Sequence, residues 1–303
     1  MKLLLTGAFQ YTERQMEMLK DMGHDLCYIQ DERIPLKEQK MEISLEEIEG
    51  VVCNGLFLYN DIEQFESLRF IQLTSAGFDR VSMEYITQKG IAIHNARGVY
   101  SVPMAEWAVW SALELYKNMA EFRQNQKAHL WKKQRNLQEL AEKKVLLLGC
   151  GNVACEVAKR FKAFDTKIKG IDKYPRPLKH FDEVLGLDYV DEQLKDADIV
   201  ISTLPLTQET YHLLNYEKLS LLGDNSIVIN ISRGQVIDED ALIKVLTKKE
   251  ILGAALDVFE TEPLNEQSPL WDLKNVIVTP HNSFVSDKNN ERMFKLILEN
   301  LQK

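Results

Sequence analysis

Short apolar runs rich in strand-forming residues alternate along this chain with longer segments of helical period. In the first hundred residues the runs are KLLLT, LCYI, VVC, FIQLTS and IAIHN, and a second series follows as VLLLG, IKGID, DIVIST, SIVINIS, LGAALDV and NVIVTPH. Such alternation is typical of parallel sheets built from strand–helix–strand units. Because it occurs twice, we predict an α/β fold of two Rossmann-like or flavodoxin-like parallel-sheet domains with a cleft between them.

A break at residues 96–140 separates the two series. Within it, Ser101-Val102-Pro103 can begin a helix, since proline fits the first helical turn. The stretch that follows, PMAEWAVWSALELYKNMAEF, is apolar around more than one face. Such a helix is usually buried on several sides, either between domains or against a second subunit. A homodimer through the helix beginning near Pro103 is therefore one expectation, because two-fold contacts are the commonest in oligomers.

The domain boundaries follow from the two series and the break. Residues 1–97 are predicted to form one domain together with residues 284–303, because the helical pattern at the end of the chain can pack back onto the first series. Residues 98–283 are predicted to form the other domain.

Composition and charge limit the classes of protein to which this chain can belong. Its 303 residues are 45% hydrophobic and 27% charged, as in globular proteins, and the formal net charge of −9 opposes binding to nucleic acid or anionic lipid. The first apolar run is too short for a signal peptide or a membrane span, so we expect a cytoplasmic protein. The four cysteines lack metal-ligand spacing, which predicts reduced thiols and no metal site.

A glycine turn joins the strand VLLLG to a helical segment in the second series. The sequence there is VLLLGCGNVA, in which Gly149 suits a tight turn and Gly151 lets the backbone approach a pyrophosphate at the helix N-terminus. Ala154 takes the third position, where only close packing of helix on strand is needed. The turn predicts a bound dinucleotide, although a methyltransferase or another nucleotide-binding protein can have the same order of elements.

Asp172 ends the next strand, 21 residues after Gly151. An acid at that distance is positioned to accept hydrogen bonds from the adenosine ribose hydroxyls. It also repels a 2′-phosphate, which favours NAD over NADP as the cofactor. Lys173 and Arg176 follow directly and soften that preference.

Residues able to carry chemistry follow the predicted strands of the second series. Arg233 comes after SIVINIS, Asp257 and Glu262 after LGAALDV, and His281 after NVIVTP, while Pro205 follows DIVIST. The carboxyl ends of parallel strands share one edge, and ligands of open α/β sheets bind there. We therefore expect these side chains to lie at one site.

Several strings of this sequence resemble a known family in order and spacing. The strings are TLPLTQET, NISRGQVIDEDAL, GAALDVFETEPL and TPHNS, with QLTSAGFDRV and GIAIHNARGVYSVPMAEWAV upstream. Together with the glycine turn they are similar to the D-isomer-specific 2-hydroxyacid dehydrogenases, including phosphoglycerate dehydrogenase-like members. The resemblance covers most of the chain and implies an NAD-dependent oxidoreductase that interconverts a 2-oxo acid and a D-2-hydroxy acid.

The resemblance implies a role for each of three residues, and their chemistry permits it. His281 can exchange a proton with the carbonyl oxygen near neutral pH. Glu262, in the family's role, hydrogen-bonds the other imidazole nitrogen and orients the ring. Arg233 offers a planar fork for the substrate carboxylate.

Further site residues are implied by the resemblance. The loop of Ser75, Ala76 and Gly77 is small enough for its backbone N–H groups to converge on the same carboxylate. At the cofactor, the family likeness places Asn152 and Val153 at the pyrophosphate, Leu204 and Pro205 beside the adenosine, Ile231 and Ser232 near the nicotinamide, and Asp257 by the carboxamide.

One departure and one alternative remain. The family often has glycines soon after the histidine, whereas this chain has Asn282-Ser283-Phe284-Val285, so the identity of the 2-oxo acid stays open. The alternative function is a dinucleotide-sensing interaction protein of the corepressor kind, with weak turnover or none. Presence of Arg233, Glu262 and His281 argues against it.

Overall fold

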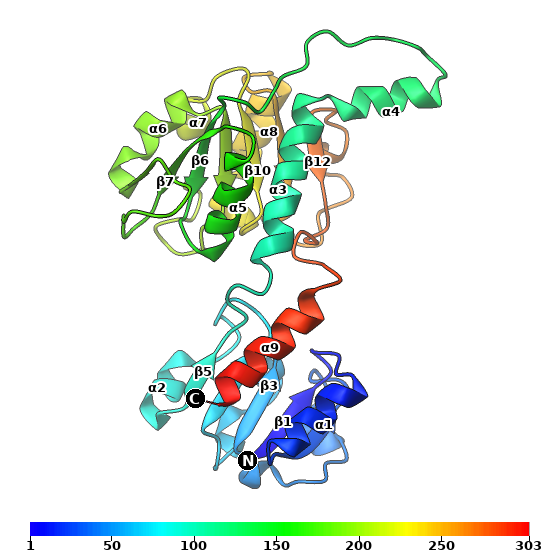
Figure 1. Cartoon of the computed structure of the whole chain (residues 1–303), viewed down its shortest axis with the longest axis vertical. Coiled ribbons are helices and arrows are strands. Elements are labelled where there is room, and N and C mark those ends of the chain that lie inside the picture. Colours follow the sequence, from blue (N-terminus) through cyan, green and yellow to red (C-terminus); the bar gives the residue numbers. More distant parts are fainter. Residues whose placement is uncertain (303) are drawn as a thin grey trace. The chain divides into compact units, whose positions relative to one another are not determined.

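The structure is a computed structural model that describes residues 1–302, and the chain forms two compact units (Figure 1). Unit 1 consists of Met1–Val99 and the segment from Ser286 onward, and unit 2 of Tyr100–Val285. Both are parallel α/β units, as predicted, because each contains strand–helix–strand crossovers that place helices on the sheet faces. No helix in residues 1–302 is both long enough and apolar enough to cross a membrane.

Unit 1 is a five-stranded parallel sheet with strand order β2-β1-β3-β4-β5. Its strands are β1 (Lys2–Thr6), β2 (Asp25–Ile29), β3 (Gly50–Cys53), β4 (Phe70–Leu73) and β5 (Ala92–His94), and its helices are α1 (Glu13–Asp21), α2 (Met83–Lys89) and α9 (Asn289–Leu301).

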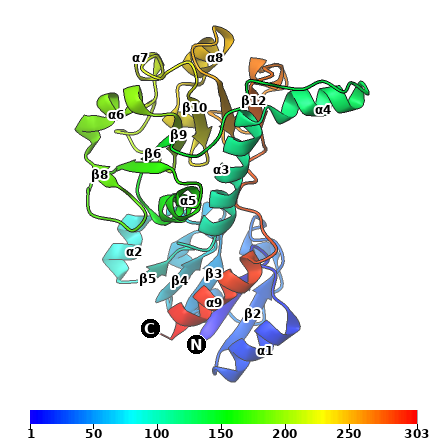
Figure 2. The same ribbon diagram turned by 45° about the horizontal axis from the view of Figure 1, so that its top comes forward.

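The C-terminal helix α9 packs against the unit 1 sheet (Figure 2). Met293, Phe294 and Ile297 on one side of this helix are buried. The buried Asn300 donates from Nδ2 to Gln72 Oε1 of β4 at 2.8 Å, so a polar pair fixes the helix on the sheet.

Unit 2 is a seven-stranded parallel sheet with strand order β12-β11-β10-β9-β6-β7-β8. Every strand predicted from the sequence is present, and the short edge strand β8 was missed. The strands are β6 (Lys144–Leu148), β7 (Lys167–Ile171), β8 (Glu183–Leu185), β9 (Ile199–Ser202), β10 (Ile227–Asn230), β11 (Gly253–Leu256) and β12 (Val276–Val278). The helices are α3 (Ser101–Tyr116), α4 (Met119–Lys127), α5 (Asn152–Lys162), α6 (Val190–Asp196), α7 (Tyr216–Leu219) and α8 (Glu239–Thr247).

Helices cover both faces of the unit 2 sheet. Side chains of a strand alternate between faces, so Leu147 packs with α3 and α5, whereas Leu146 packs with α6, α7 and α8. This double coverage explains the near-continuous apolar runs of the second series. From β6 the chain adds β7 and β8 on one side, and it then returns to add β9 on the other side of β6. The point between β6 and β9 where the strand order reverses is a topological switch point, and ligands of such sheets bind at its carboxyl edge.

The apolar stretch after Ser101 forms two helices instead of the single one that its pattern suggested. Asn118 adopts a left-handed conformation (φ 48°) between α3 and α4, which ends the first helix and redirects the chain. In Figure 1, α4 extends away from the unit 2 sheet, and a long segment without helix or strand leads back to β6.

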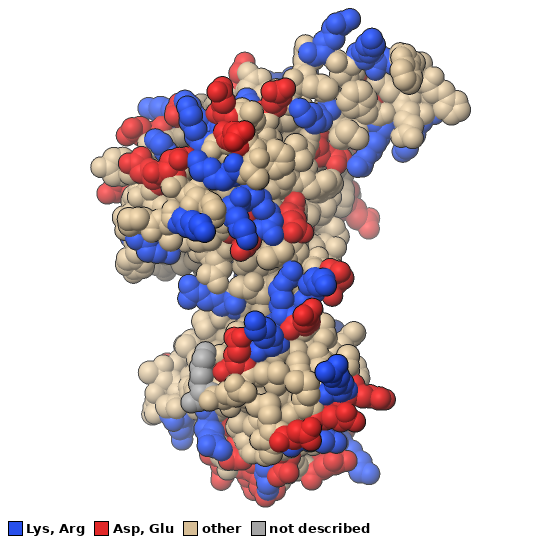
Figure 3. Space-filling view, viewed as in Figure 1, with Lys and Arg blue, Asp and Glu red and all other residues tan. Residues whose placement is uncertain are grey.

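Charged side chains of both signs are mixed over the surface in view. Figure 3 shows Lys and Arg interspersed with Asp and Glu on this face of each unit. The face in view therefore shows no single-sign basic field of the kind that binds polyanions, in keeping with the formal net charge of −9.

Candidate active site

The glycine turn after β6 leaves space beside the N-terminus of α5. Gly149 has φ +85°, and a Cβ there would lie 3.2 Å from the Leu204 backbone, so the fold itself requires this glycine. A Cβ at Gly151 would meet nothing within 4 Å. The second glycine is therefore not needed by the surrounding chain, and the space next to it is available to a ligand.

The first turn of α5 presents backbone donors to that space. The helix begins at Asn152 and its N-cap residue is Gly151. Among the described residues, no side-chain hydrogen bond caps this N-terminus. Asn152 is exposed, Val153 is half-buried and Ala154 is fully buried against the sheet. Uncapped N–H groups and the positive end of the helix dipole suit a pyrophosphate.

Cys150 lies inside this turn and is a packing residue. Its thiol is buried, which together with nearby Asp172 raises the pKa to about 12. A thiol with that pKa is protonated at neutral pH and is a poor nucleophile.

Asp172 follows β7 directly and is held by the backbone on two sides. Its Oδ2 accepts from Cys150 N at 2.8 Å and its Oδ1 from Tyr174 N at 2.9 Å. The side chain keeps 18% of its surface exposed. The carboxylate is therefore fixed beside the glycine turn while part of it still faces solvent.

A network of hydroxyl and amide groups shapes the ends of β9 and β10. Ser202 and Ser232 share a hydrogen bond of 2.7 Å between their Oγ atoms, and Ser232 Oγ also donates to Asn230 Oδ1 at 2.8 Å. Asn230 Nδ2 in turn donates to the carbonyl of Arg233 at 3.0 Å. The buried network fixes the turn that leads to Arg233, and sequence reasoning missed Asn230 and Ser202 because such contacts are not periodic.

Arg233 itself is exposed at this edge. Its Nη1 donates to the Ser232 carbonyl at 2.7 Å, and within residues 1–302 no other hydrogen bond engages the guanidinium fork, so it can bind an anion. The other predicted residues of these loops differ in exposure, since Leu204, Ile231 and Ser232 are buried and Pro205 is exposed.

His281 and Glu262 form a direct pair across the ends of β11 and β12. His281 Nδ1 lies 2.8 Å from Glu262 Oε2, and Glu262 Oε1 accepts from the backbone N–H of Phe259 at 3.1 Å. The side chains are 44% and 38% exposed, respectively. Glu262 thus holds one ring nitrogen, which leaves Nε2 to exchange a proton with a bound molecule.

Asp257 organises the loop that carries His281. Its carboxylate is fully buried and accepts from Thr279 Oγ1 at 2.6 Å, Asn282 N at 2.8 Å and Ser283 N at 2.9 Å. Its carbonyl accepts from His281 N at 2.8 Å, and His281 has φ 50°. These bonds stabilise a left-handed residue that would otherwise be strained. Sequence reasoning missed this role.

Phe284 occupies the segment in which the sequence departs from the family pattern. Its ring contacts that of His281 edge-on, with centroids 6.1 Å apart and planes at 84°. It also packs edge-on against Tyr100 at 5.6 Å. An aromatic ring therefore restricts the imidazole from a second direction.

In unit 1, the loop after β4 presents free backbone donors. The carbonyls of Ser75, Ala76 and Gly77 accept hydrogen bonds from Ala96 N, Asn95 Nδ2 and Ser75 Oγ, respectively. The three backbone N–H groups have no partner in the part of the chain that the structure describes. Successive free N–H groups are the donors of an anion nest.

Comparison with known proteins agrees with this geometry. A model of the NAD-binding domain of D-isomer-specific 2-hydroxyacid dehydrogenases matches residues 109–283. The chain belongs to this family. It is 32% identical over 251 residues to a glyoxylate reductase of Korarchaeum cryptofilum, covering 80% of this chain and 75% of that protein.

Two further proteins illustrate the range of the family. A D-3-phosphoglycerate dehydrogenase of Methanocaldococcus jannaschii is 34% identical over 256 residues, covering 84% of this chain and 49% of that protein. The solved structure of a D-isomer-specific 2-hydroxyacid dehydrogenase of Xanthobacter autotrophicus, in complex with NADPH and MES, has a TM-score of 0.81 at 26% identity, covering 99% of this chain and 93% of that one.

Family membership confirms the predicted class of protein. The chain is an oxidoreductase of the 2-hydroxyacid dehydrogenase class that uses a nicotinamide dinucleotide for 2-oxo acid reduction. The alternative of a sensing protein without turnover is not favoured, because these relatives are named for enzymatic activities.

Proposed function

We propose that this dehydrogenase reduces a small 2-oxo acid to a D-2-hydroxy acid with His281 as the proton donor. The observation that carries the proposal is the 2.8 Å pair of His281 Nδ1 and Glu262 Oε2, at the same sheet edge as Arg233 and the glycine turn. When bound, the nicotinamide cofactor supplies the hydride. The side chains of this chain bind the acid, orient it and move the proton.

His281 and Glu262 divide the proton transfer between them. Glu262 holds Nδ1 of the imidazole, so the protonated ring directs its Nε2–H toward the carbonyl oxygen of the acid. As hydride adds to C2, negative charge grows on that oxygen, and the proton from Nε2 neutralises it. In the reverse direction the neutral Nε2 removes the same proton.

Arg233 and the loop of Ser75, Ala76 and Gly77 are the proposed binding groups for the acid. A guanidinium fork pairs with a carboxylate through two parallel hydrogen bonds. The free N–H groups of the unit 1 loop support a role for that loop in binding a carboxylate. Residues 1–97 with 284–303 then serve as the substrate-binding domain, and residues 98–283 as the NAD-binding domain.

NAD is proposed to be the preferred cofactor over NADP. Asp172 is fixed beside the glycine turn with part of its carboxylate exposed, as a ribose-binding acid would be. In the family's pattern, Asn152 and Val153 bind the pyrophosphate, Leu204 and Pro205 the adenosine, and Ile231, Ser232 and Asp257 the nicotinamide end. Since three hydrogen bonds already occupy the carboxylate of Asp257, any bond to the carboxamide must use a remaining lone pair.

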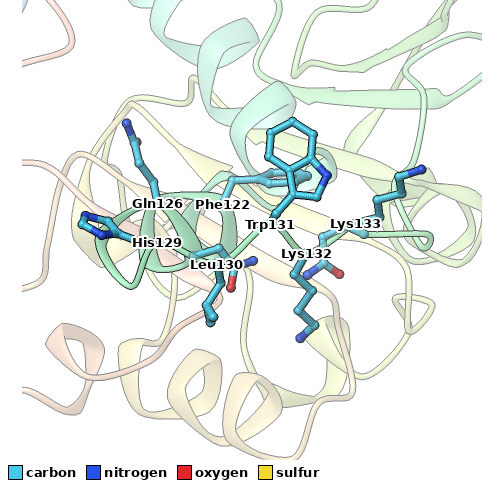
Figure 4. A pocket seen from close by; sticks show the side chains of 9 residues that line it. Phe122, Gln126, His129, Leu130, Trp131, Lys132 and Lys133 are labelled. Atoms are coloured by element: carbon cyan, nitrogen blue, oxygen red, sulfur yellow. The ribbon is translucent and has the colours of Figure 1, made fainter.

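A homodimer is proposed because unit 2 leaves large apolar side chains in solvent. Trp131 is 97% exposed and Leu130 57% exposed, in a segment that follows α4, and Trp110 of α3 is 40% exposed. A pocket of about 660 Å³ lies between α4 and this segment (Figure 4). Exposed aromatic residues beside a pocket are typical of protein interfaces.

Sedimentation tests the proposed dimer. It should show a dimer that Trp131→Ala weakens, and a monomer at micromolar concentration would contradict the proposal.

The substrate and the setting are proposed from the relatives and the sequence. Because one relative is a glyoxylate reductase and another a phosphoglycerate dehydrogenase, glyoxylate, hydroxypyruvate and 3-phosphohydroxypyruvate are the first acids to test. A cytoplasmic location remains a prediction.

A panel of 2-oxo acids tests the proposed function. NADH oxidation is followed at fixed protein concentration with glyoxylate, hydroxypyruvate, 3-phosphohydroxypyruvate, pyruvate and a branched 2-oxo acid. We expect turnover of at least one acid, strongly reduced when Arg233 is replaced by Ala. Binding of NADH with no turnover across the panel would instead support a sensing protein.

A further inference from the structure

Lys173 is a residue whose charge should favour NADP, yet it follows the acid that favours NAD. A lysine ammonium is a compact charge that pairs readily with phosphate. In the proposed function Asp172 faces the adenosine ribose, so the next residue lies close to where a 2′-phosphate would be. The two neighbours therefore give opposite indications of cofactor choice.

The structure shows that Lys173 is already paired. Its Nζ donates to Glu209 Oε1 at 3.0 Å and to Oε2 at 2.9 Å. The hydrogen bond and the charge of Glu209 raise the pKa of Lys173. Both side chains are more than half exposed, so solvent screens the pair and it contributes little to folding stability.

Glu209 belongs to a loop whose backbone is fixed by its neighbours. Thr207 N donates to Thr210 Oγ1 at 2.8 Å, and that buried hydroxyl donates to the Pro205 carbonyl at 2.7 Å. The loop follows β9, and Lys173 follows β7. Because β6 lies between β9 and β7 in the sheet, the Lys173–Glu209 pair joins the loops on either side of the glycine turn.

The second nearby cation is also occupied. Arg176 Nη2 donates to the Cys150 carbonyl at 3.1 Å and its Nη1 to the Tyr174 carbonyl at 3.0 Å. Its guanidinium lies 3.7 Å from Asp172. The two carbonyls hold the guanidinium in place, and Asp172 offsets part of its charge.

We propose that Glu209 is a second determinant of the preference for NAD and acts through Lys173. By holding the ammonium with both oxygens, Glu209 offsets a positive charge that would otherwise attract a 2′-phosphate, and its own charge repels that phosphate. This inference rests on the proposed function, in which Asp172 binds the adenosine ribose. It assigns Glu209 a positioning role that is separate from the groups that contact the substrate.

Glu209→Gln tests the inference, because it keeps the shape of the side chain and removes its charge. Binding of 2′,5′-ADP, ADP, NADPH and NADH is measured by calorimetry or nucleotide fluorescence. We expect the Kd of 2′,5′-ADP and NADPH to fall about fivefold, the size of an exposed charge pair, while the Kd of ADP and NADH changes less than about twofold. The gain should shrink at high salt, since exposed charges are screened.

Matched variants separate this role from a structural one. Glu209→Asp should keep the wild-type preference, and Lys173→Gln added to Glu209→Gln should remove the gain in NADPH binding, because the freed ammonium is then absent. An unchanged ratio of NADPH to NADH affinity in Glu209→Gln, or an equal change in both, would overturn the inference. Wild-type protein that binds neither ADP nor NADH would overturn the proposed function as well.

Discussion

The carboxyl edge of the unit 2 sheet uses carboxylates differently at its two ends. At the histidine end (Asp257, Glu262 and His281), the buried Asp257 receives hydrogen bonds from the chain, and the exposed Glu262 pairs with the imidazole of His281. At the proposed adenosine end (Asp172, Lys173 and Glu209), Asp172 both accepts backbone bonds and stays partly exposed. At the histidine end, one acid supports the loop and another acid pairs with the imidazole. At the other end, Asp172 alone both supports the backbone and presents an exposed carboxylate.

Arg233, between the two ends, should show as large an effect on turnover as any residue of this edge. Arg233→Ala is expected to lower kcat/KM for the 2-oxo acid about a thousandfold, the loss associated with a charge-assisted pair, while the Kd of NADH changes less than about twofold. Arg233→Lys should recover little, because an ammonium lacks the planar fork. Full activity in Arg233→Lys would show that a point charge suffices.

Asp257→Asn should affect both folding and activity at the histidine end. The amide cannot accept at both former oxygens, so the free energy of unfolding should fall by about 2 kcal/mol, the cost of leaving a buried group unpaired. Turnover should fall about a hundredfold, because the loop that positions His281 loses its anchor. Urea denaturation and steady-state kinetics measure the two effects. Unchanged stability would mean that other contacts hold the loop.

Glu262→Gln should separate activity from stability. The pair with His281 is well exposed, so the free energy of unfolding should change by less than about 0.5 kcal/mol. Turnover should fall about thirtyfold, since a neutral amide orients the ring but does not stabilise its charge. If stability fell as far as in Asp257→Asn, the proposed division of roles between the two acids would be wrong.

Asp172→Ala should give the smallest effect and act on cofactor choice. Removal of the acid is expected to weaken the preference for NADH, so that the Kd of NADPH divided by the Kd of NADH falls about tenfold. Asp172→Glu is the conservative control. Because the backbone N–H groups of Cys150 and Tyr174 also lose their acceptor, thermal unfolding should shift downward in parallel. An unchanged preference would remove Asp172 from its assigned role.

Much of the fold could be predicted because parallel sheets leave local signals. Apolar runs such as VLLLG and SIVINIS mark buried strands, and turn residues mark their ends. Since the carboxyl ends of all parallel strands share one edge, Arg233, Glu262 and His281 could be placed at a common edge without knowing any contact. The short strand β8 was missed because three residues at a sheet edge carry little pattern.

The supporting contacts could not be predicted, because they join residues far apart in sequence. Asp257 bonds to Ser283 and Glu209 to Lys173, and neither pair follows a helical or strand period. The break at Asn118 was missed for a related reason, since a single left-handed residue between two helical patterns does not interrupt the apolar periodicity.

The role of His281 is the central claim, and one pair of measurements tests it most directly. The Kd of NADH and the kcat for the best 2-oxo acid are measured side by side in wild-type protein and in His281→Gln. We predict that kcat falls about a thousandfold, as for loss of a general acid, while the Kd of NADH changes less than about twofold. A variant that retained wild-type kcat would show that the proton comes from another group.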